Sequence, residues 1–434
     1  MTTTCKDGIP SDSSFSVPQE LLDYILDFLH DDSPTLRACA LVSRAFLPCS
    51  RYHVYSSVTI VYVSELDKFR EKFAGQLYQC QNLAALLEHS PHVAPLVTRF
   101  GIHANWHMPD ILMYTSLLPI IQSLRNLSHI EFVAPSYPGR RFWVRFPVDT
   151  RTLFLAALRS LSLKTLILKG FNFPNDGLFD DVITAAAANP TLKHLSLLCH
   201  HEGAETSEPY PPIRPPTNGL PALETLSISG RTTPRNILWL FFTQYLYSVS
   251  GIRHLSLQIY RGTPCSLIQS LLNEMKETLE CFTLEIIPRI DRKVGFDLSR
   301  HRNLSSFYAI VPDSWGLGSV PEMRLNPTLR TLTVEHFSEA YESAMHELRA
   351  WKEIDRLALP ALERVHIMLH DSVHGACYLE GRCNTCELQF RNLDTSDRCQ
   401  WQRWVENNMP LLNDRGILEV EVIKQRHSVS EGFG

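Results

Sequence analysis

Residues 16–60 read SVPQELLDYILDFLHDDSPTLRACALVSRAFLPCSRYHVYSSVTI, and they hold two helix-sized apolar patterns. The apolar side chains of the first pattern fall on one wide face of a helix, at Leu21, Leu22, Ile25, Leu26, Phe28 and Leu29. Pro18 lies in the expected first turn, where its missing N–H leaves no helical hydrogen bond unmade. Ser33 is the expected N-cap of the second helix, which continues through Leu36.

This stretch carries more apolar side chains than it can bury alone. A chain of about 40–60 residues buries too little apolar surface to offset the entropy that it loses on folding. The helices therefore need a second surface. One interpretation makes residues 16–60 the N-terminal cap of a larger domain, and the other makes them a docking unit for a partner.

Three motifs in this stretch have a characteristic spacing. They read Val17-Pro18-x-Glu20-Leu21-Leu22-x-x-Ile25-Leu26-x-x-Leu29, Leu36-x-x-Cys39-x-Leu41-Val42-Ser43-Arg44-x-Phe46 and Tyr52-x-x-Tyr55. The spacing resembles an F-box and is most similar to the F-box-like proteins abundant in mushroom-forming fungi. This chain has Val17 where the family usually has Leu, and Phe46 where it usually has Trp.

The resemblance implies a partner and a role. In the family this face binds a Skp-type adaptor, which links it to a cullin ubiquitin ligase. The implied adaptor-binding residues are Pro18, Leu21, Leu22, Ile25, Leu26, Leu41, Val42 and Phe46. The chain would then be a substrate receptor that holds a target protein and performs no covalent chemistry itself.

A second pattern, Leu-x-x-Leu-x-Leu, recurs along the rest of the chain. Copies start at residues 127, 163, 192, 223, 252, 279, 304, 329 and 362, with an earlier copy at 97 and a degenerate one at 418. From 163 to 329 the starts lie 25–31 residues apart, in and just above the range of about 20–29 residues for leucine-rich repeats. Each interval leaves room for one strand and one helix, and such units must stack to bury their apolar faces.

The predicted fold class is α/β: a small N-terminal helical F-box unit, then an irregular leucine-rich-repeat solenoid with parallel strands inside and helices outside. We expect residues 1–15 to be disordered, 16–60 to form the F-box-like unit, 61–423 the solenoid and 424–434 a tail. A doubly wound α/β sheet is the alternative fold, because it also alternates strands and helices.

The strands of such a solenoid turn alternate side chains toward the face opposite the helices. On this face the possible target-binding residues are His194, His254, Glu285, Tyr308, Glu335, Arg364 and His366. Concave faces of repeat proteins bind other proteins. The alternative interpretation is an ordinary solvated sheet face.

Composition excludes several classes of function. With 41 Lys+Arg against 46 Asp+Glu, the formal net charge is −5, so we expect no nucleic-acid surface. No apolar run reaches the ~18 residues that a membrane span needs, and no secretory signal is visible. The odd count of 11 Cys indicates free thiols and a cytoplasmic or nuclear location.

The sequence offers little catalytic chemistry. It contains no HExxH, GxxxxGK[ST] or GxSxG motif, so we expect neither an enzyme nor a cofactor. Cys383-x-x-Cys386 has the spacing of half a zinc site, but reduced structural thiols are the default interpretation. The second functional hypothesis is a stand-alone leucine-rich-repeat scaffold without a ubiquitin role.

Overall fold

A computed structural model describes residues 17–61, 76–78, 80–103, 117–133, 148–173, 176–201, 222–229, 237, 247–259, 263–286, 295–311, 320, 323–338, 351–357, 359–371, 402–403 and 405–424. The chain divides into two compact units, Met1–Leu127 and Ser128–Gly434. The domain boundary predicted at residue 60 therefore lies inside the first unit. The segments predicted as a disordered N-terminus and as a C-terminal tail lie outside the described residues, except for position 424.

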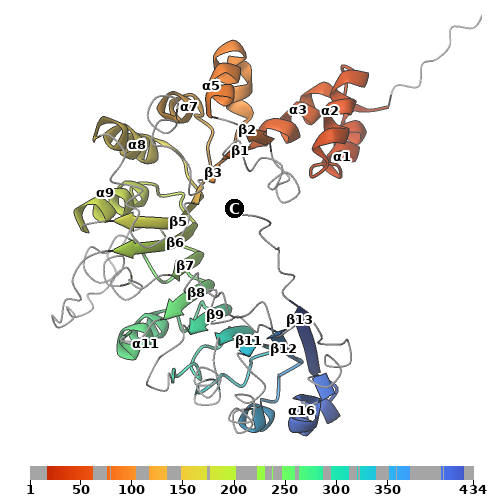
Figure 1. Cartoon of the computed structure of the whole chain (residues 1–434), viewed down its shortest axis with the longest axis vertical. Coiled ribbons are helices and arrows are strands. Elements are labelled where there is room, and N and C mark those ends of the chain that lie inside the picture. Colours follow the sequence, from red (N-terminus) through yellow and green to blue (C-terminus); the bar gives the residue numbers. More distant parts are fainter. Residues whose placement is uncertain are drawn as a thin grey trace, which may run out of the picture. The chain divides into compact units, whose positions relative to one another are not determined.

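The first unit begins with three helices, α1 (Gln19–Asp27), α2 (Ser33–Val42) and α3 (Leu47–Ser56) (Figure 1). Their core consists of Leu26, Leu36 and Val54, which are at most 7 % exposed. The N-cap of α2 is Asp32, not the predicted Ser33, because the Asp32 carboxylate accepts a hydrogen bond of 3.1 Å from the Thr35 backbone N–H. The Thr35 hydroxyl also donates to this carboxylate, at 2.6 Å, and the hydrogen bonds from the Thr35 hydroxyl and N–H lower the pKa of Asp32.

Three parallel strands follow α3 within the same unit. β1 (Ser57–Val61) pairs with β2 (Gln76–Tyr78) on one side and with β3 (Arg99–His103) on the other. The remaining elements are α5 (Cys80–His89), the 3-10 helix η2 (Pro91–Leu96) and α7 (Leu117–Ser123). The Thr98 N–H donates to the Ser56 carbonyl at 3.0 Å, so the end of α3 is bonded to the segment that leads into β3.

The second unit repeats strand and helix. Its helices and strands include β4 (His129–Val133), α8 (Val148–Ser160), β5 (Thr165–Phe173), α9 (Asp176–Ala187), β6 (His194–His201), β7 (Thr225–Ser229), β8 (His254–Ile259), α11 (Cys265–Glu274), β9 (Cys281–Ile286), β10 (Ser306–Val311), β11 (Thr331–Ser338), β12 (Arg364–Asp371), α16 (Pro410–Asp414) and β13 (Leu418–Lys424). Each strand from β4 to β13 pairs in parallel with the next one along the chain. In Figure 1 α8, α9 and α11 lie on the same side of these strands.

The register of these strands aligns the repeated leucines. Leu166 pairs with Leu195, and Leu195 in turn pairs with Leu226. Leu166, Leu195 and Leu226 are each at most 1 % exposed. The repeats therefore stack their fourth and sixth positions into one continuous core, as predicted, in a mixed α/β fold with a parallel sheet. A doubly wound sheet reverses its strand order, and the described strands β4 to β13 follow the order of the chain.

Buried polar side chains bind successive repeats to each other. Asn189, His301 and Asn326 each stand three residues before the first leucine of a copy and are at most 3 % exposed. Asn189 donates to the Leu158 carbonyl at 2.5 Å, and Asn326 to the His301 carbonyl at 2.8 Å. A ring nitrogen of His301 lies 2.9 Å from the Leu272 carbonyl. Each side chain therefore hydrogen-bonds to a backbone carbonyl that precedes it by 25 or more residues.

Candidate functional site

The first candidate surface is an apolar stripe on α1. Leu21, Tyr24, Ile25 and Phe28 recur at intervals of three and four residues, and each is 53–71 % exposed. The rings of Tyr24 and Phe28 meet edge to face, with centroids 4.9 Å apart. The stripe is therefore a continuous apolar surface that no described part of the chain covers.

A second apolar element lies at the end of α2, where Leu41 is 89 % exposed and Val42 is 77 % exposed. The Gln19 side chain donates to the Ala45 carbonyl at 2.8 Å. This hydrogen bond places the start of α1 next to the chain that leaves α2. The stripe and the Leu41–Val42 pair therefore belong to one region of the three-helix unit, which we call the docking face.

The structure divides the eight predicted adaptor-binding residues. Pro18, Leu21, Ile25, Leu41 and Val42 are exposed, and Leu22 is partly buried. Leu26 is 2 % exposed and forms the core, with Phe46 packed against it. The side chains of these last two residues hold the three helices together, because an apolar residue on the inner face of a helix is buried by its own neighbours. Tyr24 and Phe28, which the prediction omitted, belong to the docking face.

The second candidate surface is the sheet face opposite the helices in the second unit. The strand register distributes the seven predicted target-binding residues over three rows. His194, His254 and Arg364 occupy one row, Tyr308 and His366 the next, and Glu285 and Glu335 the third. The other five residues lie on β9 to β12. His254 lies on β8, which pairs with β9, whereas His194 lies on β6, which pairs with none of these strands.

Four side chains do come together, on β9 to β12. The Tyr308 hydroxyl donates to Glu335 Oε2, and His370 Nε2 lies 2.7 Å from Glu335 Oε1. Burial raises the pKa of Glu285, the hydrogen bond with Gln258 lowers it, and the negative charge of Glu335 raises it further. We call Glu285, Tyr308, Glu335 and His370 the acidic cluster.

The target-binding candidates chosen from the sequence did not include His370. The residue lies within β12, where alternation places it on the same face as His366 and Met368. The sequence feature that could have identified His370 is the length of this strand, which continues for four residues beyond Ile367, to Asp371. His370 is 11 % exposed, and Glu335 is 15 % exposed.

Further carboxylates border the acidic cluster on β13. Glu421 lies 3.3 Å from His366 Nε2, and Glu419 accepts a hydrogen bond of 2.7 Å from Arg364. Among the described residues, this face therefore carries the carboxylates Glu285, Glu335, Glu419 and Glu421 together with Arg364, His366 and His370.

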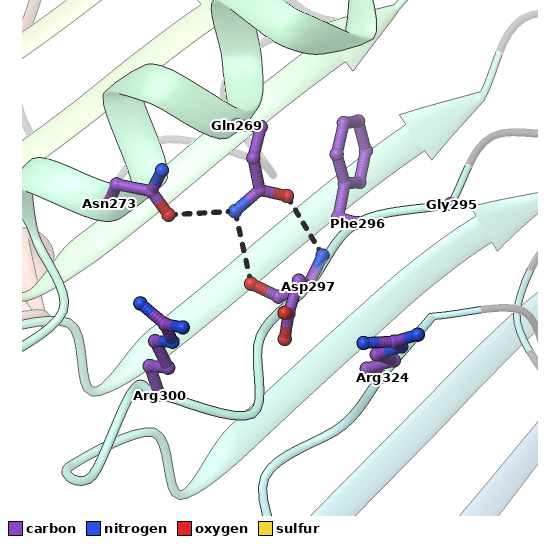
Figure 2. A pocket seen from close by; sticks show the side chains of 7 residues that line it. All are labelled: Gln269, Asn273, Gly295, Phe296, Asp297, Arg300 and Arg324. Carbon is purple, nitrogen blue, oxygen red and sulfur yellow. Dashed lines mark hydrogen bonds between the residues drawn. The ribbon is translucent and has the colours of Figure 1, made fainter.

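A polar pocket of about 360 Å³ opens beside α11 (Figure 2). The Gln269 amide accepts from the Asp297 N–H at 2.8 Å and donates to the Asp297 carbonyl at 3.1 Å. Hydrogen bonds from Ser299 lower the pKa of Asp297, as do the charges of Arg324 and Arg300. The polar groups of this pocket thus bind one another and attach the connecting segment to α11.

Side chains able to share a metal ion occur, within the described ranges, at Asp27, Cys49 and His53. The predicted thiols Cys383 and Cys386 lie outside the described residues.

No described helix is both long and apolar enough to cross a bilayer. No protein-family model matches the chain, and no curated protein matches it in sequence.

Proposed function

We propose that this protein is a substrate-receptor subunit of a cullin-type ubiquitin ligase. In this proposal α1–α3 form an F-box that binds a Skp-type adaptor, and the stacked strands form an irregular leucine-rich-repeat solenoid that holds a target protein. The chain orients the target and leaves the covalent chemistry to other subunits. Such a complex acts in the cytoplasm or the nucleus.

The observation that carries the proposal is the exposure of the docking face. Leu26, Leu36 and Val54 already give the three helices a closed core. Leu21, Ile25 and Leu41 nevertheless remain more than half exposed. Apolar side chains gathered on one surface mark an interface, and covering them yields about 25 cal/mol per Å² of apolar area.

Adaptor binding can be tested with two substitutions at exposed positions, Ile25→Asp and Leu41→Asp. Each places a charge in the proposed interface without entering the core, so the fold is retained while adaptor binding weakens by at least about 2 kcal/mol. Co-purification with a Skp-type adaptor, followed by isothermal titration calorimetry, measures the effect. Point substitutions are preferable to deletion of residues 1–60, because α3 packs against η2 and β1.

Leu411→Asp is the matched control. Leu411 is 54 % exposed and lies on α16 in the second unit, so the same change there leaves adaptor binding intact. Equal adaptor affinity of wild type and both docking-face variants would refute the F-box assignment.

On the target side, we infer that the acidic cluster and the neighbouring Glu419 and Glu421 of β13 bind a lysine- or arginine-bearing segment. Four carboxylates on the described part of this face favour a cation, and the partial burial of Glu335 strengthens the attraction. A peptide array probed with the full chain should retain basic peptides, and the double variant Glu335→Gln with Glu421→Gln should lose them. Because the contact is ionic, binding should also weaken as salt rises. Equal retention of acidic peptides would contradict this inference.

The scaffold alternative has one observation in its favour. The hydrogen bond from Thr98 to Ser56 ties α3 to the segment before β3, so the three helices also act as an end cap. Hydrogen exchange on the isolated chain separates the two functions. If the three helices are only a cap, the α1 amides exchange equally fast with and without the adaptor, whereas an F-box gains protection in α1 when the adaptor is added.

A further inference from the structure

A mixed set of donor atoms lies between α1 and α3, beside the core of the three-helix unit. Asp27 ends α1, while Cys49 and His53 stand one turn apart on α3. One oxygen, Asp27 Oδ1, lies 2.8 Å from His53 Nε2 and 3.8 Å from Cys49 Sγ. The three ligand atoms are all within 4.8 Å of one another.

We propose that Asp27, Cys49 and His53 form a binding site for Zn²⁺. A thiolate, an imidazole and a carboxylate are the donor types that zinc takes, whereas magnesium and calcium prefer oxygen alone. Around a tetrahedral zinc with bonds of about 2.0–2.3 Å, neighbouring ligand atoms stand roughly 3.2–3.8 Å apart. The His53–Asp27 distance has to widen by less than about 1 Å to reach that range.

The helices hold these donors in place without a metal. Val54, next to His53, belongs to the core with Leu26 and Leu36, and the Cys49 side chain packs against that core. His53 is 13 % exposed, whereas Asp27 is 60 % exposed. The fourth coordination position therefore opens on the solvent side, where water completes the tetrahedron.

The electrostatics of the site favour a cation. Burial raises the pKa of Cys49 to about 11, and the charges of Asp27 and Asp23 contribute to the rise. The negative charges of Asp27 and Asp23 disfavour an unliganded Cys49 thiolate, and the same charges attract a divalent cation. On binding, the Cys49 thiol releases its proton to solvent and the sulfur bonds to zinc, while neutral His53 binds through Nε2 and keeps its proton on Nδ1. Affinity therefore increases with pH.

A simpler role for two of these residues is an ion pair. Asp27 lies at the C-terminal end of α1, where the helix dipole disfavours a carboxylate, and protonated His53 compensates for it. That role does not involve Cys49. Substitution of the cysteine therefore distinguishes a zinc site from an ion pair.

The test is titration of the metal-free full chain with Co²⁺ and then Zn²⁺. Wild type should develop the near-ultraviolet charge-transfer band of a thiolate–cobalt bond, and Zn²⁺ should abolish it. Cys49→Ser should lose one equivalent of bound metal. Cys39→Ser is the matched control, because Cys39 is another partly buried cysteine packed against the same core.

A second pair of variants keeps the cysteine in place. Asp27→Asn should weaken zinc affinity by roughly tenfold or more, and Asp31→Asn, a nearby exposed carboxylate, should not. Circular dichroism verifies the fold of each variant. Equal metal stoichiometry in wild type and Cys49→Ser, or equal zinc affinity in wild type and Asp27→Asn, would overturn the site. Neither result bears on adaptor binding, which is measured separately.

Discussion

Two leucines of α2 illustrate how position on a helix decides the role of a residue. Leu36 is fully buried against Leu26 and Val54, whereas Leu41 is 89 % exposed five residues later. Five residues correspond to about 500° of helix rotation, which places the two side chains on different faces. The same residue type thus supports the fold at one position and is available to a partner at the other.

This contrast predicts opposite effects on stability. Leu36→Ala removes a core side chain and leaves a cavity, so the free energy of unfolding should fall by about 2–5 kcal/mol. Leu41→Ala should change it by no more than about 0.5 kcal/mol. Urea denaturation followed by circular dichroism measures both values. A large loss of stability in Leu41→Ala would mean that this side chain is covered within the chain.

The raised pKa of Glu285 predicts a pH dependence of stability. Since burial is the largest cause of the rise, the folded state holds the proton at pH values where the unfolded chain has lost it. Stability therefore falls as pH increases from the unfolded pKa, about 4.3, through the raised folded pKa. Glu285→Gln should be more stable than wild type at pH 7, and the difference should vanish below pH ~4.

Thermal unfolding of both proteins between pH 4 and 8 provides the measurement. Glu419→Gln is the control, because Glu419 is an exposed carboxylate on the same face for which this argument predicts no such gain. Parallel pH profiles of wild type and Glu285→Gln would contradict the role assigned to burial.

At the scale of elements, the repeats depend on buried polar side chains as well as on leucines. Asn326 Nδ2 donates to the Ser299 carbonyl at 3.0 Å and to the His301 carbonyl at 2.8 Å. Its Oδ1 accepts from the Thr328 N–H at 2.7 Å. One side chain in the segment between β10 and β11 therefore forms hydrogen bonds with three backbone groups.

Replacing this asparagine should cost more than replacing an exposed one. Asn326→Ala removes three hydrogen bonds, of which the one to the His301 carbonyl is buried, so stability should fall by about 1–3 kcal/mol. Asn303 also donates to a carbonyl of the preceding copy, that of Glu277 at 2.6 Å, but it is exposed. Water can replace it, and Asn303→Ala should cost less than about 1 kcal/mol. Equal losses by urea denaturation would show that burial does not decide the cost.

Sequence periodicity predicted the strands well, because a period of two with leucines at fixed offsets determines which face is buried. Leu195 and Leu197 are both buried, as their positions in the copy require. The same reasoning did not find Asn326 or His370, since their partners lie 25 or more residues away. Side-chain pairing across strands depends on register, and register follows from the assembled sheet.

At the scale of the whole molecule, the sequence pattern indicated some helical features correctly and others incorrectly. The apolar residues of segment 66–89 have a helical spacing, but within the described residues Gln76–Tyr78 is a strand and the helix starts at Cys80. A parallel partner for β1 overrode the local helical pattern. The exposed candidates Leu21 and Ile25, in contrast, were found from the sequence, since α1 has more apolar residues than one buried face can hold.

Stability should also vary along the second unit. Strands β9 to β11 have neighbours on both sides, and Phe282, Phe307 and Leu332 are at most 1 % exposed. β13 is the terminal strand of the sheet, and its apolar residues Leu418 and Val420 are only partly buried. In a repeat array each strand depends on its nearest neighbours, so the end strand opens at a lower free energy than the middle.

Native-state hydrogen exchange measured by mass spectrometry tests this gradient. Amides of β13 should exchange at least about tenfold faster than those of β10, because opening β13 breaks one strand pairing and exposes little core. Leu332→Ala in β11 should accelerate exchange in both of its neighbours, while leaving β5 and β6 unchanged. Uniform exchange across β5 to β13 would mean instead that the unit opens as one cooperative block, and the nearest-neighbour description would then fail.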